Sequence, residues 1–237
     1  MNKATFHIKV GGDYACFTNP GLKVERCTYP VMTPAAARGL LEAIYWKPQF
    51  RWEIREIKVL KPIKQISIMR NELNERQGKN PIIIDDPKNR AQRTSLILKD
   101  VEYVIKADLV LKEGINNIMG YIDQFARKLK TGQYHHTPYL GTREFAAWFE
   151  SATGDEEPEC IIKEYPIGQM LFDSAYIEDN ERKEIDFHLH GHTHSNDKRV
   201  ARGYQSAVYF DAIVENNILK IPPKKYLELY EKEGVHV

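Results

Sequence analysis

Cysteine is scarce in this chain of 237 residues, which contains only Cys16, Cys27 and Cys160. Their number is odd and their separations match no metal-binding spacing, so the sequence predicts neither a disulfide framework nor a zinc site. A secretory leader is also missing from the start of the sequence. We therefore expect a protein that works in the reducing cytoplasm.

Long apolar runs and an excess of one charge are missing as well. No apolar run approaches the roughly 20 residues that a membrane-spanning helix requires, which argues against a membrane protein. The 34 basic side chains nearly balance the 33 acidic ones, giving a net charge of +1. A nucleic-acid surface would therefore have to come from local clusters of basic residues.

Alternating apolar residues predict strands in the first half of the chain. The clearest run covers residues 101–109, and a shorter one covers residues 6–10. Between residues 52 and 59 the alternation changes phase at Arg55 and Glu56, which indicates a β-bulge.

Two helices are predicted between these strands. Thr33 can cap the first helix and Pro34 suits its first turn, while Pro48 should end it near Tyr45 or Trp46. Its buried stripe would be Ala37, Leu40, Leu41 and Ile44. The second helix should end at Gly132. Its apolar face would consist of Ile115, Ile118, Met119, Ile122, Phe125 and Leu129.

This order of elements predicts an α+β fold with a ferredoxin-like domain of the RNA-recognition-motif type over residues 1–150. A polar insertion at about residues 70–93 reads as a projecting hairpin. The acidic segment 151–159 would then separate a smaller β-rich part, residues 160–237, which ends in a hairpin that turns at Asn216 and Asn217.

The end of the first helix carries the most distinctive side chains. Tyr45, Trp46 and Lys47 supply a phenol, an indole and a cation, which together suit a phosphodiester or a base. The alternative is that Tyr45 and Trp46 simply close a hydrophobic core.

A basic cluster follows the predicted second helix. Arg127, Lys128 and Lys130 precede a loop with His135 and His136, and Arg143 comes soon after. Cations can hold phosphates and histidines can stack on bases. The alternative is that the cations only complement the helix dipole. Lys88, Arg90 and Arg93 form a weaker basic group, which a solvated surface also explains.

Histidines alternate at positions 188, 190, 192 and 194. On a strand they would share one face at a spacing that suits a transition metal. The segment GHTH resembles part of the metallophosphoesterase signature, but the Asn-His-Glu or Asn-His-Asp element of that family is missing. We therefore predict no catalytic metal and no cofactor, and take the run as an exposed polar strand face or loop.

The stretch GGDYACFTNPGLKVERCTYPVMTPAAARGLLEAIYWKP, residues 11–48, resembles the N-terminal signature of the CRISPR-associated Cas5 family, type I-C subtype. GQYHHTPYLGTREFAAWFE at residues 132–150 is similar to a later stretch of that family. Weaker similarities lie at residues 166–176 and 210–222. These stretches follow the family's order over most of the chain, whereas residues 70–93 and 179–205 resemble nothing in it.

The resemblance implies the ferredoxin-like fold and a metal-independent endoribonuclease. Such a protein cuts the CRISPR repeat RNA at its hairpin and stays on the 5′ handle as a subunit of the type I-C interference complex. It leaves duplex DNA open as a further partner. Two alternatives are a scaffold that binds RNA without cutting it and, more remotely, a metal-dependent phosphoesterase.

The resemblance also implies site residues. The family's processing members use a tyrosine at the end of the first helix, which is Tyr45 here. They also use a Lys-His pair early in the second helix, whose place is taken by Gly120 and Tyr121. Either cleavage is weak or lost, or nearby groups have assumed the roles. The groups considered are His135, His136, Lys47, Lys128 and Tyr121.

The candidate catalytic residues are therefore Tyr45, His136 and Tyr121. The candidate RNA-binding residues are Trp46, Lys47, Arg127, Lys128, Lys130, His135 and Arg143.

Overall fold

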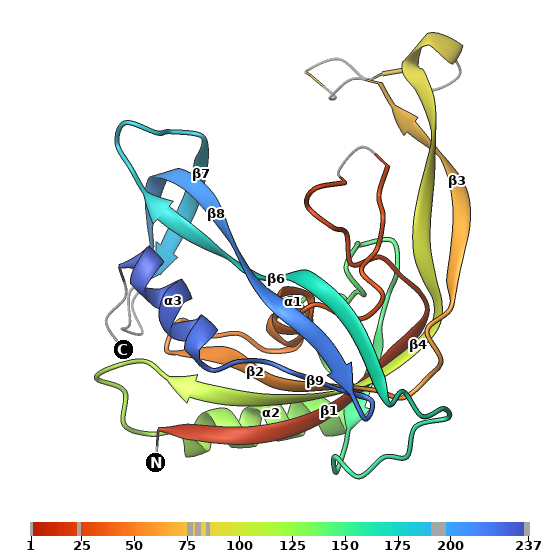
Figure 1. Ribbon diagram of the computed structural model, residues 1–237. Helices are drawn as coiled ribbons and strands as arrows, with labels where there is room; N and C mark the ends of the chain where they lie inside the picture. Colours follow the sequence, from red (N-terminus) through yellow and green to blue (C-terminus); the bar gives the residue numbers. More distant parts are fainter. Residues whose placement is uncertain are drawn as a thin grey trace.

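The computed structural model describes residues 2–22, 25–74, 78, 82–83, 86–190 and 198–234. These residues form an α+β fold with a large antiparallel sheet and three α-helices (Figure 1). The strands are β1 (Lys3–Ala15), β2 (Phe50–Val59), β3 (Gln65–Leu73), β4 (Arg90–Leu111), β5 (Trp148–Ser151), β6 (Glu164–Glu178), β7 (Ile185–His190), β8 (Lys198–Glu215) and β9 (Ile218–Lys220). The helices are α1 (Pro34–Ile44), α2 (Met119–Thr131) and α3 (Lys224–Glu233).

One continuous path of strands runs through the sheet in the order β5-β1-β4-β2-β9-β8-β6, with β3 attached to β4 and β7 to β8. The predicted phase change in β2 is confirmed, because its register with β4 shifts between Ile54 and Glu56. The predicted turn between β8 and β9 is also confirmed. Asn216 and Asn217 adopt φ angles of 49° and 66°, a conformation that asparagine tolerates better than most residues.

Helix α1 has the predicted bounds. The Thr33 side chain accepts a hydrogen bond from the Ala36 N–H at 3.2 Å, and the helix ends at Ile44 with Tyr45 as its cap residue. The predicted apolar stripe is buried. Helix α1 packs against β2 and β6, which holds its C-terminal residues next to the sheet.

Helix α2 differs from the prediction at its start. It ends at Gly132, as expected, but begins only at Met119, so Ile115 lies in the preceding loop. Gly114 has a φ of 81°, and the Asn117 side chain accepts a hydrogen bond from the Met119 N–H at 3.2 Å. These local features delay the helix, and Met119 is 59% exposed instead of facing the core.

Helix α3 was not predicted from the sequence. It follows Pro222 and Pro223 and buries Tyr226, Leu229 and Tyr230, a spacing of i, i+3 and i+4 that is typical of an amphipathic helix. In the described part of the chain, the segment after residue 160 therefore contains four strands and this helix.

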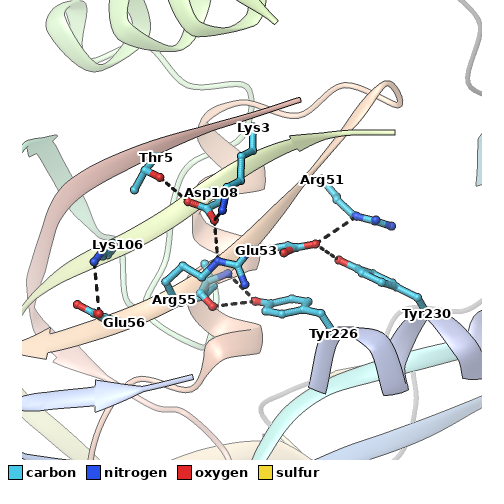
Figure 2. A network of polar contacts seen from close by, with 11 residues as sticks. Lys3, Thr5, Arg51, Glu53, Arg55, Glu56, Lys106, Asp108, Tyr226 and Tyr230 are labelled. Atoms are coloured by element: carbon cyan, nitrogen blue, oxygen red, sulfur yellow. Dashed lines mark hydrogen bonds and ion pairs between the residues drawn. The ribbon is translucent and has the colours of Figure 1, made fainter. Parts of the chain in front are cut away.

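A buried polar network ties α3 to the sheet (Figure 2). Tyr230 donates a hydrogen bond to the Glu53 carboxylate at 2.9 Å, and the Tyr226 hydroxyl bonds to the main chain of Ile54. Arg55 joins Glu53 to Asp108, which it contacts at 2.7 Å. Burial opposes the ionisation of Asp108, but its hydrogen bonds from the Thr5 hydroxyl and from Arg55 outweigh that effect and lower its pKa.

Strands β3 and β4 pair from Gln65–Leu98 to Leu73–Arg90 and extend away from the other strands as an arm (Figure 1). The arm carries the polar segment for which we expected a hairpin. Among the residues described, no helix is both long and apolar enough to cross a membrane.

Candidate functional site

Tyr45 occupies the junction between α1, β2 and α2. Its side chain is 3% exposed, and its ring packs against Phe50 and Phe125, with centroids 5.2 and 6.1 Å away. The Trp52 indole N–H donates to the Tyr45 carbonyl oxygen at 2.9 Å. The ring thus belongs to the core, as one of the two sequence interpretations proposed.

The hydroxyl group of Tyr45 reaches the edge of that core. It donates a hydrogen bond at 2.9 Å to the side-chain oxygen of Gln124, an exposed residue of α2. Burial and the neighbouring Tyr121 raise the pKa of Tyr45 to about 12, while Arg127 acts in the opposite direction. At neutral pH this phenol is therefore protonated, and it can donate a proton or hydrogen bond but not serve as a base.

The loop after α2 returns to the end of α1. The backbone N–H groups of His135 and His136 both donate to the Ala43 carbonyl oxygen, each at 2.9 Å. Both side chains are exposed. This return brings the loop against Ala43, two residues before Tyr45 in the sequence.

In an extended loop these adjacent imidazoles would point in opposite directions, but here they do not. Their ring centroids lie only 4.3 Å apart. The physical reason is that both N–H groups converge on one carbonyl oxygen, so the chain turns here instead of running extended. Both rings are therefore available to the same surface.

Tyr121 lies in the first turn of α2, on the same side of the junction. Its half-buried ring packs edge-on against Phe50 with centroids 5.7 Å apart. Gly120 is exposed, and a Cβ atom added there would meet no other atom within 4 Å. The fold thus brings Tyr45, Tyr121 and the His135–His136 pair together around the end of α1.

The basic residues of α2 continue this surface. Arg127 and Lys130 are exposed and Lys128 is half-buried. Within the described ranges none of the three forms an ion pair with a carboxylate, and the same holds for Lys47 and Arg143. Positive charge without an acidic partner is available to an external anion.

The basic residues of the β3–β4 arm are different. Arg70 pairs with Glu144 and with Glu72 at 3.1 Å, and Arg93 approaches Glu72 at 3.6 Å. Acidic neighbours thus neutralise much of this charge, although Lys88 and Arg90 remain outside that cluster.

Trp46, a candidate RNA-binding residue, lies at a hollow of the surface. Its side chain is 38% exposed and lines an open pocket of about 950 Å³ between α1, β2, β4, β6 and α3. Neither the two histidines of the loop nor Tyr121 lines this pocket, although Trp46 follows Tyr45 directly.

The run of alternating histidines lies mostly outside the residues that the structure describes. His188 is exposed on β7, nothing is described of the His190 side chain, and His192 and His194 fall outside the described residues. Among the side chains that are described, no group of three or more His, Cys, Asp or Glu could hold a metal ion.

Two groups at the junction were missed by sequence reasoning. Gln124 was not singled out because it lies 79 residues from Tyr45, and no local pattern reports a contact over that separation. The Ala43 carbonyl is a main-chain group, whose role depends only on how the later loop folds back.

Comparisons with a family model and with individual relatives agree on one protein family. A family model described as CRISPR-associated protein (Cas_Cas5) matches residues 5–216. The chain is 47% identical over 234 residues, 98% of each protein, to a "CRISPR pre-crRNA endoribonuclease Cas5d" of Thermus thermophilus. It is 37% identical over 241 residues to a protein with the same name from Mannheimia succiniciproducens, covering 94% of this chain and 96% of the relative.

A solved structure of a CRISPR-associated protein has a similar fold. The TM-score is 0.62 with 20% sequence identity, and the match covers 94% of each chain.

Proposed function

The chain belongs to the CRISPR-associated Cas5 family, type I-C, and on this premise we propose that it cuts precursor CRISPR RNA within the repeat and remains bound to the product. The observation that carries this proposal is the 47% identity, along nearly the whole length, to a protein named a pre-crRNA endoribonuclease. The proposed partners are the repeat RNA and the other subunits of a type I-C interference complex, in the cytoplasm. Duplex DNA is a further candidate ligand.

The proposed chemistry is attack by the RNA's own 2′-hydroxyl group on the adjacent phosphate. This reaction needs a base for the 2′-hydroxyl proton, an acid for the leaving 5′-oxygen and positive charge for the phosphate. Tyr45, protonated at neutral pH, suits the donor role. His136 or His135 supplies an imidazole, a group that titrates near neutrality, for the base role.

The remaining roles fall to groups around the same helix end. Arg127, Lys128 and Lys130 are proposed to hold the phosphates, and Tyr121 to orient the ribose or base next to Tyr45. This assignment is supported by their unpaired charge within the described ranges and by the packing of Tyr121 against Phe50.

The test is to incubate purified protein with its cognate repeat RNA in EDTA and to map the product ends. Cleavage that persists, with a 2′,3′-cyclic phosphate end, supports the proposal, since two-metal hydrolysis stops on chelation. Cleavage that needs added metal contradicts it. Changing both His135 and His136 to alanine should abolish cleavage, and a single change should abolish it only where that imidazole alone acts as the base. Because the two rings are 4.3 Å apart, the double variant decides whether one imidazole substitutes for the other.

A non-cleaving scaffold is the second candidate, favoured by one observation: Gly120 and Tyr121 occupy the place of the family's Lys-His pair. In that case wild-type protein binds the repeat RNA but leaves it intact. Replacing Gly120 by Lys and Tyr121 by His should then create activity. The open space around Gly120 accommodates a lysine side chain. Replacing Tyr121 by histidine, however, removes the ring that packs against Phe50 and leaves a gap there.

We also propose that β1, α1, β2, β4, α2 and β5 form a ferredoxin-like unit. The support is the strand order β5-β1-β4-β2, which is the order expected of a β-α-β-β-α-β chain. The division into parts at residues 1–150 and 160–237 is a related proposal. Residues 152–163 lie outside any helix or strand, although β9 pairs with β2 and so joins the two parts in one sheet.

A further inference from the structure

The open pocket beside Trp46 has the character of a ligand site. Its volume of about 950 Å³ is within the range of small-molecule sites, and neither His135 nor His136 lines it. Aromatic side chains stand in its wall, among them Trp46 and Tyr176, which are 38% and 41% exposed. Exposed rings of this kind offer flat surfaces on which a base can stack.

Two cations line the same pocket without full compensation. The Arg51 guanidinium lies 3.7 Å from the centre of the Tyr230 ring, and its Nε is buried without a hydrogen bond. Its nearest carboxylate, Glu53, is 3.5 Å from that nitrogen and already accepts hydrogen bonds from Arg55 and Tyr230.

Lys112 is the second cation. It is half-buried and forms no ion pair with any residue in the described ranges. Burial and the positive charge of Arg51 lower its pKa, although the negative charges of Glu233 and Glu42 act in the opposite direction. An anion placed between Arg51 and Lys112 would reduce the repulsion between these two cations.

The carboxylates of the pocket are mostly engaged by the protein itself. Asp173 accepts two hydrogen bonds from Arg38, at 2.6 and 2.8 Å, and Glu42 accepts one at 2.8 Å. Glu233 accepts from the Tyr176 N–H at 3.3 Å, and burial raises its pKa. These acidic groups would repel a run of phosphates, so the pocket suits one nucleotide and not a continuous strand.

We propose that this pocket binds a single nucleotide of the RNA, with the base stacked on Trp46 and a phosphate between Arg51 and Lys112. The inference rests on the proposed function, because it takes RNA as the ligand. Trp46 follows Tyr45 directly, so a nucleotide held here would flank the proposed cleavage site and fix the position of the RNA along it.

The test uses cognate repeat RNA with 2′-fluoro groups in place of the 2′-hydroxyls, which prevents cleavage, and 2-aminopurine placed at one position at a time. For wild-type protein, one position should change its fluorescence on binding. Trp46→Leu should remove that response and lower affinity roughly 5- to 160-fold, the range for one lost base–aromatic stack. Trp46→Phe should retain most of both.

Lys112→Gln should weaken RNA binding. It should also reduce the slope of log affinity against log salt concentration by about 0.7, the value for one phosphate contact on a single strand. The matched controls are Trp148→Leu, at a tryptophan that is 43% exposed, and Lys220→Gln, at an exposed lysine of β9. Both controls should behave as wild type. Melting temperatures within a few degrees of wild type exclude unfolding as the cause.

The pocket proposal would be wrong if the wild-type protein bound the RNA tightly but the Trp46 and Lys112 variants changed neither the fluorescence at any position nor the affinity. That result would not contradict the proposal that the protein binds RNA. If the wild-type protein bound no RNA, the proposed function would fail together with it. If the pocket variants kept full RNA affinity but lost co-purification with the other complex subunits, the pocket would be a protein-docking site, and the nucleotide proposal would be wrong.

Discussion

Tyr45 combines two roles that the sequence presented as alternatives. Its ring is enclosed by Phe50 and Phe125, while its hydroxyl is bonded to the exposed Gln124. A substitution that removes only the hydroxyl therefore separates chemistry from packing.

Tyr45→Phe should reduce cleavage by on the order of 10²-fold or more, the effect of a lost acid–base group, and change RNA affinity only a few-fold. Stability should fall by about 0.5–1.5 kcal/mol, the net value of one hydrogen bond. Single-turnover cleavage, RNA titration and urea unfolding measure the three quantities. Gln124→Ala is the control that removes the hydrogen bond and keeps the phenol. Full activity of the Phe variant would leave Tyr45 as a packing residue only.

At the scale of elements, the C-terminal half of α2 is proposed to be the phosphate-binding element. Changing Arg127, Lys128 and Lys130 together to alanine should flatten the dependence of log affinity on log salt concentration by up to about 2, since each phosphate contact on a single strand contributes about 0.7. RNA titrations at several salt concentrations provide the slope. The control is the triple change of Lys220, Lys224 and Lys232, which are exposed. If the slope did not change, the phosphate contacts would have to be assigned to another surface, and residues 88–93 of the arm would be the next candidate.

Helix α3 depends on its buried hydroxyl groups for its attachment to β2. Tyr230→Phe removes the donor to Glu53, which is 7% exposed, and should cost about 1–3 kcal/mol because a buried carboxylate loses a partner. Thermal unfolding should show a drop of roughly 2–10 °C. Leu227→Gln, at a 59% exposed position of the same helix, should change stability by less than about 0.5 kcal/mol. Equal effects of the two changes would contradict the role of the buried bond.

At the scale of the whole molecule, buried phenols make stability depend on alkaline pH. Burial raises the pKa of Tyr45 to about 12 and also raises those of Tyr103, Tyr226 and Tyr230. Because the folded state holds these groups neutral, their contribution is complete below pH about 10, the pKa of a phenol in the unfolded chain, and is lost as the pH rises towards 12.

Urea unfolding at pH 8, 10 and 11 should therefore show a steep loss of stability only above pH about 10, of roughly 2–3 kcal/mol for Tyr45 alone by pH 12. Absorbance at 295 nm follows phenolate formation in the folded protein. Titration of all 13 tyrosines together near pH 10 in the folded state would contradict the prediction.

Local patterns in the sequence were sufficient for much of the fold. The Thr33 cap, the Pro48 stop, the bulge near Arg55 and the Asn216–Asn217 turn all depend on residues adjacent in the chain, and each has the expected structure. The predicted start of α2 was wrong because the prediction considered only the spacing of apolar residues. Gly114 and Asn117, which delay the start of the helix, are not apolar and did not enter it. The i, i+3, i+4 spacing of α3 was present but overlooked.

Which chemical groups are present was determined by the sequence alone: a phenol at the end of the first helix, two adjacent histidines and a basic helix end. Their arrangement was decided only by the tertiary structure. The Ala43 carbonyl oxygen accepts hydrogen bonds from the backbone N–H groups of both histidines, and Gln124 accepts one from the Tyr45 hydroxyl. Lys112 and Trp46 line the same pocket. These contacts join residues far apart in the chain, and their energies depend on burial and distance, which exist only once the chain has folded.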